Sequence, residues 1–195
     1  PDIPGVEYSI TSDEAFHLES LPESVAVIGG GFIACEFASI FNGMWSRVTQ
    51  IYRGEQILRG FDSDVQHTLA SEMQKKGIDI QLHLNVIELI RQPDGLITLK
   101  LDDGSEMQAD AVMFATGRVP NVRGLGLRDA GVHVLPGGMI PVNEYSQTNL
   151  QNVFAVGDVT NRVNLTPVAL MEGHAFADSE FGGSPRPVNH EFVPS

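Results

Sequence analysis

The sequence predicts an α/β fold: a doubly wound parallel, Rossmann-like sheet with an antiparallel β-meander, plus part of a second domain. Two observations predict it. Between residues 24 and 82, apolar strand-like runs alternate with helix-like segments, and the order β-α-β-α-β is typical of a doubly wound sheet. The first apolar run ends on three consecutive glycines, at 29–31, immediately before a helix-like segment.

The elements of this sheet are predicted in order along the chain. A short helix in TSDEAFHLESLP is expected to begin at an N-cap, Thr11 or Ser12. A buried strand at 25–28, a helix at about 31–44 and a second strand at 47–52 follow. The segment SDVQHTLASEMQKKG has helical apolar spacing and ends on glycine, as helices often do, and IDIQL is the third strand.

The pattern then changes from helix-like spacing to alternation of apolar and polar residues. The segments NVIELIRQ, GLITLKLDD and SEMQADAVMFAT alternate apolar and polar residues, with turn motifs PDG and DDG between them, which predicts an antiparallel meander closing on a buried strand at 111–115. Beyond Gly117 the chain is rich in glycine and proline as far as a further buried strand in NVFAVGD. A last helix is expected over about 167–181, with Thr166 as its N-cap.

Composition and charge exclude several classes of function. The 195 residues carry a formal net charge of -13, which argues against nucleic acid or an anionic membrane as a partner. No apolar run reaches the roughly 18 residues of a membrane span. The single cysteine, Cys35, predicts a buried structural thiol and a reducing, cytoplasmic location. The opening PDIPGVEYSI resembles a linker inside a longer chain rather than a signal sequence.

The glycine run has the pattern G-x-G-x-x-A over residues 29–34. Gly29 permits a tight turn, Gly31 lets a pyrophosphate approach the backbone, and Ala34 allows the helix to lie close to the strand. Amide groups at the helix N-terminus then bind the anion. A merely tight strand-to-helix turn is the alternative, but both flanking elements and a following strand favour a dinucleotide site.

The end of the second strand predicts which dinucleotide binds. NAD sites usually place a carboxylate there, whereas NADP sites place arginine near the 2′-phosphate. This sequence reads QIYRGEQILRGFD, so that Arg53 and Arg59 occupy the region and Glu55 lies beyond the strand end. Guanidinium groups pair well with phosphate oxygens, so these arginines predict NADPH. The alternative is that both are solvated loop charges.

Five motifs together resemble a known family. The segments VIGGGFIACEFASIF, IYRGEQILRGFD, FATGRVPN, FAVGDV and NLTPVAL follow one another as in glutathione reductases and their flavin-dependent pyridine nucleotide-disulfide oxidoreductase relatives. The resemblance covers essentially the whole chain. The arginine-bearing segment resembles the glutathione reductase branch; dihydrolipoamide dehydrogenase, trypanothione reductase and mercuric reductase remain alternatives.

The resemblance implies roles for matching residues. Phe32 stands where these reductases usually have a tyrosine that moves aside to admit nicotinamide, and Glu36 resembles the glutamate at the nicotinamide end. Asp158 resembles the residue that binds the ribitol of FAD, near a helix N-terminus that points at the flavin. The implied NADPH set is Gly29, Gly31, Phe32, Ile33, Glu36, Arg53, Arg59, Ala115, Gly117 and Arg118, and the implied FAD set is Gly157, Asp158, Leu165 and Thr166.

The family passes hydride from NADPH through FAD and a redox disulfide to glutathione disulfide, in a homodimer. This chain has one cysteine and one G-x-G-x-x-A motif, and no His-Glu pair from an interface domain is recognised. No catalytic residue and no metal site are therefore expected in it. The expectation is a fragment that binds NADP(H) without turnover.

The resemblance also implies a division into segments. A linker and short helix are expected at 1–20, an NADP(H)-binding domain at 21–118, a segment completing the FAD-binding domain at 119–187, and the start of a dimer-interface domain at 188–195. An apolar strand at 153–156 would then lack most of its sheet, so self-association or disorder is expected within about 119–187. Trp45 and Ser46 replace the family's Leu-Gly, which removes a C-cap glycine.

Overall fold

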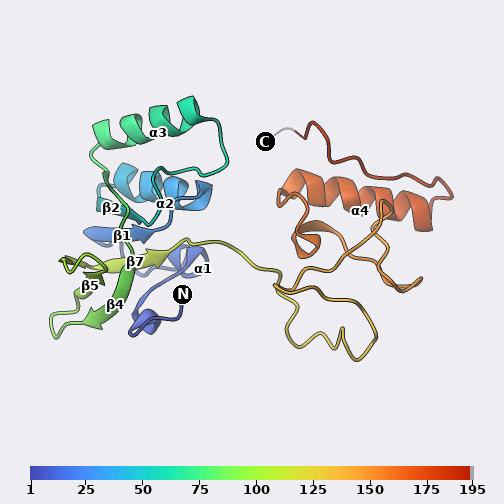
Figure 1. The fold of residues 1–195 in the computed structure, drawn as a ribbon, viewed down its shortest axis with the longest axis horizontal. Coiled ribbons are helices and arrows are strands. Elements are labelled where there is room, and N and C mark those ends of the chain that lie inside the picture. The colour runs from blue at the N-terminus through green and yellow to red at the C-terminus, as the bar shows by residue number, and fades with distance from the viewer. Residues whose placement is uncertain (194–195) are drawn as a thin grey trace. The chain divides into compact units, whose positions relative to one another are not determined.

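The computed structural model describes residues 1–193 and divides into two compact units. The first unit is Pro1–Gly117 and the second begins at Arg118 (Figure 1). The segment expected at 188–195 ends in Pro194 and Ser195, which lie outside the described residues. Within residues 1–193, no helix combines the length and the hydropathy needed to cross a bilayer.

The first unit is built on a four-stranded parallel sheet of order β3-β2-β1-β7. Its strands alternate with helices along the chain, which confirms the predicted β-α-β-α-β core. The chain reaches β7 only after a second, antiparallel sheet of order β4-β5-β6. The elements are β1 (Ser24–Ile28), α2 (Phe32–Gly43), β2 (Arg47–Tyr52), α3 (Ser63–Lys75), β3 (Asp79–Leu82), β4 (Val86–Arg91), β5 (Ile97–Leu101), β6 (Glu106–Ala109) and β7 (Ala111–Phe114).

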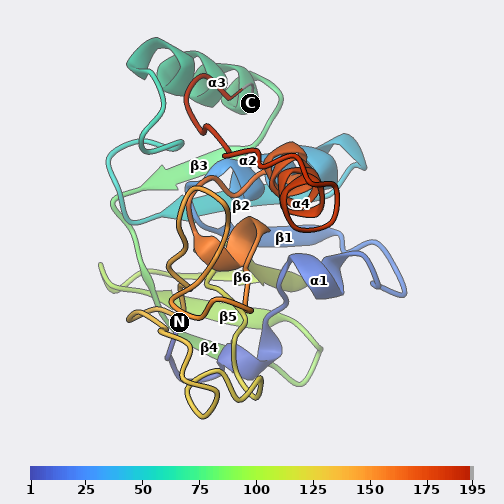
Figure 2. The same ribbon diagram turned by 90° about the vertical axis from the view of Figure 1, so that its right-hand side faces the viewer.

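The parallel sheet is covered on both faces. Helices α2 and α3 cover one face and the antiparallel sheet covers the other (Figures 1 and 2). In β1, Val25 and Val27 pack in the helix-side cluster, whereas Ala26 and Ile28 pack in the cluster beneath the second sheet. Burial on both faces explains why the strand reads as a continuous apolar run without alternation.

The N-terminal segment packs on this unit. A 3₁₀ turn, η1 (Val6–Tyr8), and a short helix, α1 (Ser12–Ala15), precede the sheet. Thr11 is the N-cap of α1 and is one of the two predicted N-cap residues. It also forms a capping box with Glu14. Ile10 adds a single parallel bridge to Met113 of β7, and this bridge ties the first residues to the sheet.

Helices α2 and α3 end in the same way. At each, the second residue past the last helical one has positive φ: +76° at Trp45 and +94° at Gly77. The Trp45 amide donates to Asn42 O at 3.0 Å and the next amide to Phe41 O at 3.0 Å, the pattern of a Schellman motif. Glycine usually occupies this position, which here is Trp45. The missing C-cap glycine was expected one residue later, at Ser46, so the structure moves the strained position to Trp45.

The second unit contains a 3₁₀ turn, η2 (Gly157–Thr160), and one long helix, α4 (Thr166–Glu180). A small apolar cluster of Val132, Ile140 and Ala155 forms its centre. The prediction of a strand in NVFAVGD was wrong, because within residues 1–193 this segment makes only one isolated bridge, from Phe154 to Gln147. An apolar run becomes a strand only where neighbouring strands can pair with it.

The predicted N-cap of the last helix was also wrong. Leu165 is the N-cap, in extended conformation, and Thr166 and Pro167 are the first two helical residues. The Leu165 carbonyl accepts hydrogen bonds from the amides of Val168 and Ala169, both at 3.0 Å, so the helix begins one residue earlier. Proline fits the first turn because the amides there need no partner within the helix.

Candidate functional site

The glycine turn lies at the carboxyl end of β1, between β2 and β7. Gly29 has φ +148° and donates its amide to Ile51 O at 2.9 Å. A Cβ added there would clash with the carbonyl oxygen of Ala115, so the turn passes directly over the end of β7. Both the dihedral angle and the close approach therefore require glycine at this position.

The amides that follow the turn have no acceptor. Gly31 is the N-cap of α2 and supplies no side chain to cap it. Among the residues that the structure describes, none accepts a hydrogen bond from the amides of residues 30–34. A Cβ added at Gly31 would meet no atom within 4 Å. Five consecutive amides thus lack a protein acceptor at the positive end of α2, with open space beside Gly31. This arrangement favours an anion.

The loop after β2 brings two arginines to this end of the sheet. Arg53 and Arg59 are both exposed, and neither makes a hydrogen bond or ion pair with the described residues. Between them, Ile57 and Leu58 are buried in the helix-side core. The Leu58 amide donates to Gly30 O. The loop is therefore anchored to the glycine turn, and both guanidinium groups remain available to a ligand.

The other residues of α2 that were predicted to bind NADPH lie in its first two turns. Phe32 is 48% exposed, and Glu36, one turn further on, is also exposed. Ile33 is half-buried and packs against the core. Because residues four apart share one helix face, Phe32 and Glu36 flank the same side of the N-terminus.

Cys35 lies on the buried face of the same helix. It is a free, buried cysteine, which confirms the predicted buried thiol. Burial is the main reason that the pKa of its thiol is raised, and the Glu36 charge adds to the increase, whereas a hydrogen bond from Gln50 opposes it. A raised pKa keeps the thiol protonated and unreactive near neutral pH.

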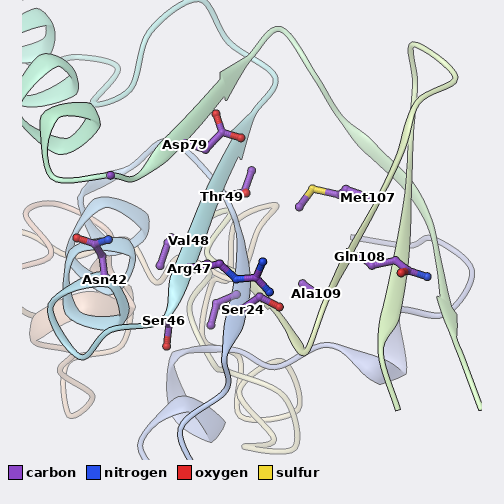
Figure 3. Close-up of a pocket in the computed structure, with 12 residues that line it drawn as sticks. Ser24, Asn42, Ser46, Arg47, Val48, Thr49, Asp79, Met107, Gln108 and Ala109 are labelled. Atoms are coloured by element: carbon purple, nitrogen blue, oxygen red, sulfur yellow. The ribbon is translucent and has the colours of Figure 1, made fainter. Parts of the chain in front are cut away.

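A cavity of about 420 Å³ lies at the opposite edge of the parallel sheet (Figure 3). It is lined by the first residues of three strands, Ser24, Arg47 and Asp79, and by residues 107–109 of β6. In open α/β sheets, ligands bind beyond the carboxyl ends of the strands. The cavity is at the amino ends, so it is not the site that the glycine turn forms.

A second group of candidate residues lies in the second unit. Asp158 is exposed in η2, directly after the buried Gly157, and none of the described residues pairs with its carboxylate. Leu165 and Thr166 are at the start of α4. Asp158 is consequently free to accept hydrogen bonds from a ligand's hydroxyl groups.

A buried carboxylate supports this turn, and sequence reasoning did not find it. Glu172, only 1% exposed, accepts from the Gly157 amide and from Arg162 Nη2 at 2.8 Å, and it lies 2.7 Å from His190 Nε2. Arg162 Nε also donates to Thr160 Oγ1, which in turn donates to Gly157 O. These contacts form a closed ring around η2. No local sequence signal marks Glu172, since its partners are 10 to 18 residues away.

The remaining predicted residues lie near the point in the chain where the first unit ends. Ala115 adjoins the glycine turn, as described above, and Gly117 is the last residue of the first unit, with φ +135°. Arg118 is exposed and begins the second unit. Within residues 1–193, no cluster of three or more histidine, cysteine or acidic side chains is arranged to hold a metal ion.

Comparison with known proteins identifies the family of the chain. A family model described as pyridine nucleotide-disulphide oxidoreductase matches residues 1–173. Glutathione reductase of Burkholderia cepacia is 51% identical over 194 residues, which cover 100% of this chain but 43% of that protein. Trypanothione reductase of Trypanosoma congolense is 43% identical over 196 residues, covering 99% of this chain and 40% of that protein.

A solved structure has the same fold over most of the chain. The HOCl-induced flavoprotein disulfide reductase RclA from Escherichia coli superposes with a TM-score of 0.90 at 28% sequence identity. The match covers 96% of this chain and 43% of the RclA chain. The chain therefore spans less than half the length of the relatives that it matches.

Proposed function

The chain belongs to the pyridine nucleotide-disulphide oxidoreductase family, and on that premise we propose that residues 21–118 are its NADP(H)-binding domain. The observation that carries the proposal is the row of five amides at residues 30–34, which have no acceptor among the described residues and face open space at Gly31. A pyrophosphate there would accept these hydrogen bonds at the positive end of α2.

The choice of NADPH over NADH is proposed to come from the loop after β2. Arg53 and Arg59 would hold the 2′-phosphate, because both guanidinium groups are exposed and have no partner in the described part of the chain. The burial of Ile57 and Leu58 orders the loop before a ligand arrives, so less conformational entropy is lost on binding. Phe32 would cover the nicotinamide end, and Glu36 would contact it.

The second unit is proposed to complete an FAD-binding domain, at residues 119–187, with residues 188–195 opening a dimer-interface domain. Asp158 would accept hydrogen bonds from the ribitol hydroxyls, and the N-terminus of α4 at Leu165 and Thr166 would face the flavin ring. Its partial positive charge would stabilise negative charge on a reduced flavin. Bound NADPH supplies the hydride in such an enzyme, and FAD carries the electrons onward. This chain's residues bind and orient the two groups.

We propose that the longer protein is a cytoplasmic, homodimeric glutathione-disulfide reductase. The 51% identity to glutathione reductase and the paired arginines support this assignment. Trypanothione reductase is the second candidate, because a relative of that kind is 43% identical. The present chain contains one cysteine and hence no redox disulfide of its own, so it is proposed to bind NADP(H) without reducing a disulfide.

Calorimetric titration with NADPH and with NADH, at one fixed ionic strength, tests the proposal. NADPH should bind at least about tenfold more tightly, and Arg53→Ala and Arg59→Ala should each remove most of that preference. Arg91→Ala is the matched control, because this arginine is exposed at the end of β4, in the other sheet. Equal affinities for the two nucleotides in the unmodified chain would contradict the assignment to NADPH.

A further inference from the structure

Gln50, a residue that the proposed function does not use, is wholly buried beneath the glycine turn. It is 0% exposed in the middle of β2, and its side chain lies on the same face of the sheet as Val48, under α2. Its Nε2 donates to Gly29 O at 3.0 Å and lies 3.6 Å from Cys35 Sγ. Burying a side-chain amide in an apolar core costs free energy, which hydrogen bonds or a functional role must offset.

The compensation within the core is incomplete. Gln50 Oε1 is buried and has no hydrogen-bond partner among the residues that the structure describes. An apolar side chain at this position would avoid that cost, as Val48 and Ile51 do in the same strand. The favourable contact of the Gln50 side-chain amide is therefore its hydrogen bond to Gly29 O in the glycine turn.

That contact determines which way the turn presents its amides. In a trans peptide the C=O and the following N–H point in opposite directions. Because Gln50 holds Gly29 O inside the protein, the Gly30 amide is directed away from the core. The Leu58 amide holds Gly30 O in the same manner, and this contact orients the Gly31 amide. Both carbonyls, which would repel an anion, are thus occupied, and both donors remain without a protein acceptor in the described residues.

We propose that Gln50 is a positioning residue for the dinucleotide: by binding Gly29 O, it orients the Gly30 amide toward the pyrophosphate. The inference rests on the proposed dinucleotide-binding function of the first unit. It concerns the pyrophosphate, which NADPH and NADH share, and not the 2′-phosphate that distinguishes them. Gln50 therefore contributes affinity for both nucleotides and no preference between them.

The experiment replaces Gln50 by methionine, a flexible apolar side chain of similar length. Gln50→Met removes the donor to Gly29 O and also the unpartnered Oε1, and these two changes act in opposite directions on stability. Titration with NADPH and with NADH should show both dissociation constants raised about tenfold. This is the effect of losing one hydrogen bond to a charged group, here the bond from the Gly30 amide to the pyrophosphate. Their ratio should be unchanged, and the melting temperature should move by less than about 3 °C.

Controls separate this role from a structural one. Gln74→Met changes an exposed glutamine of α3 and should leave both affinities as they are. Gln50→Leu removes the same donor with a branched side chain and should reproduce the loss of affinity. A lower melting temperature with unchanged affinities in both Gln50 variants would overturn the inference while the proposed function stands. An unmodified chain that binds neither nucleotide would instead refute the proposed function, and the inference with it.

Discussion

Replacing Trp45 by glycine tests whether the positive φ angle at the C-terminal end of α2 destabilises the folded chain. Trp45 has φ +76°, a conformation that costs an ordinary residue about 1–2 kcal/mol. Its side chain is 93% exposed, so the substitution removes little buried surface. Glycine adds about 0.5–1 kcal/mol of conformational entropy to the unfolded chain, which offsets part of the gain. The expected net effect of Trp45→Gly is a stabilisation of about 0.5–1 kcal/mol.

Thermal unfolding followed by circular dichroism measures this effect. Fluorescence is unsuitable because Trp45 is the only tryptophan of the chain. The melting temperature of the transition should rise by about 1–4 °C, as expected for a chain of this size. The matched control is Gly77→Ala at the end of α3, where φ is +94° and an added Cβ would approach only Asn42 Nδ2, at 4.0 Å.

The control should be destabilised by about 1 kcal/mol, since the backbone angle alone opposes the new side chain. If Gly77→Ala were destabilised as expected but Trp45→Gly were also destabilised, the reasoning would fail. Such a result would mean that the exposed indole stabilises the folded chain by more than the backbone strain costs.

Four further substitutions give distinct outcomes. Gly31→Ala should leave the melting temperature unchanged and weaken dinucleotide binding, whereas Gly29→Ala should lower the melting temperature. Of these two added Cβ atoms, only the one at Gly29 would clash with the protein itself. Equal effects of the two substitutions on stability would contradict this explanation. Glu172→Ala should destabilise the second unit by about 2–3 kcal/mol, because it leaves Arg162 and the Gly157 amide without their buried partner. The unfolding transition of the second unit measures this loss. An unchanged transition would show that the ring of contacts around η2 does not stabilise this unit. Burial raises the pKa of Cys35, so the folded state keeps this proton to higher pH than the unfolded state. The stabilisation is complete below about pH 8.5 and is lost as pH rises above that value. Urea unfolding at alkaline pH should therefore show a smaller decline for Cys35→Ala than for the unmodified chain.

The parallel sheet and its turn were predictable from sequence because their signals are local. A strand covered on both faces reads as a continuous apolar run, and β1 and β7 both show it. Within the turn, Gly29 needs glycine because of its own backbone angle and because Ala115, just after β7, lies close to it. Arg53 and Arg59 were also identified from sequence, because the alternation of strands and helices locates the end of β2, which they follow.

The errors arose where structure depends on distant partners. The apolar segment around Phe154 has the composition of a strand, but in the described residues only Gln147 pairs with it. Thr166 has the chemistry of an N-cap, yet the carbonyl of Leu165 is the first to accept helical hydrogen bonds. Gln50 and Glu172 are buried polar residues whose partners come from other elements, so no spacing in the sequence marks them.

The unpartnered amides at the N-terminus of α2 are proposed to hold a dinucleotide pyrophosphate. The most direct test is an amide-resolved NMR titration of the isotopically labelled chain with NADP⁺. We expect the amide signals of residues 30–34 to shift most, together with those of Arg53 and Arg59, while those around the cavity at Ser24 and Asp79 stay in place. Shifts confined to the cavity, or an unchanged Gly31 amide at saturating NADP⁺, would contradict it.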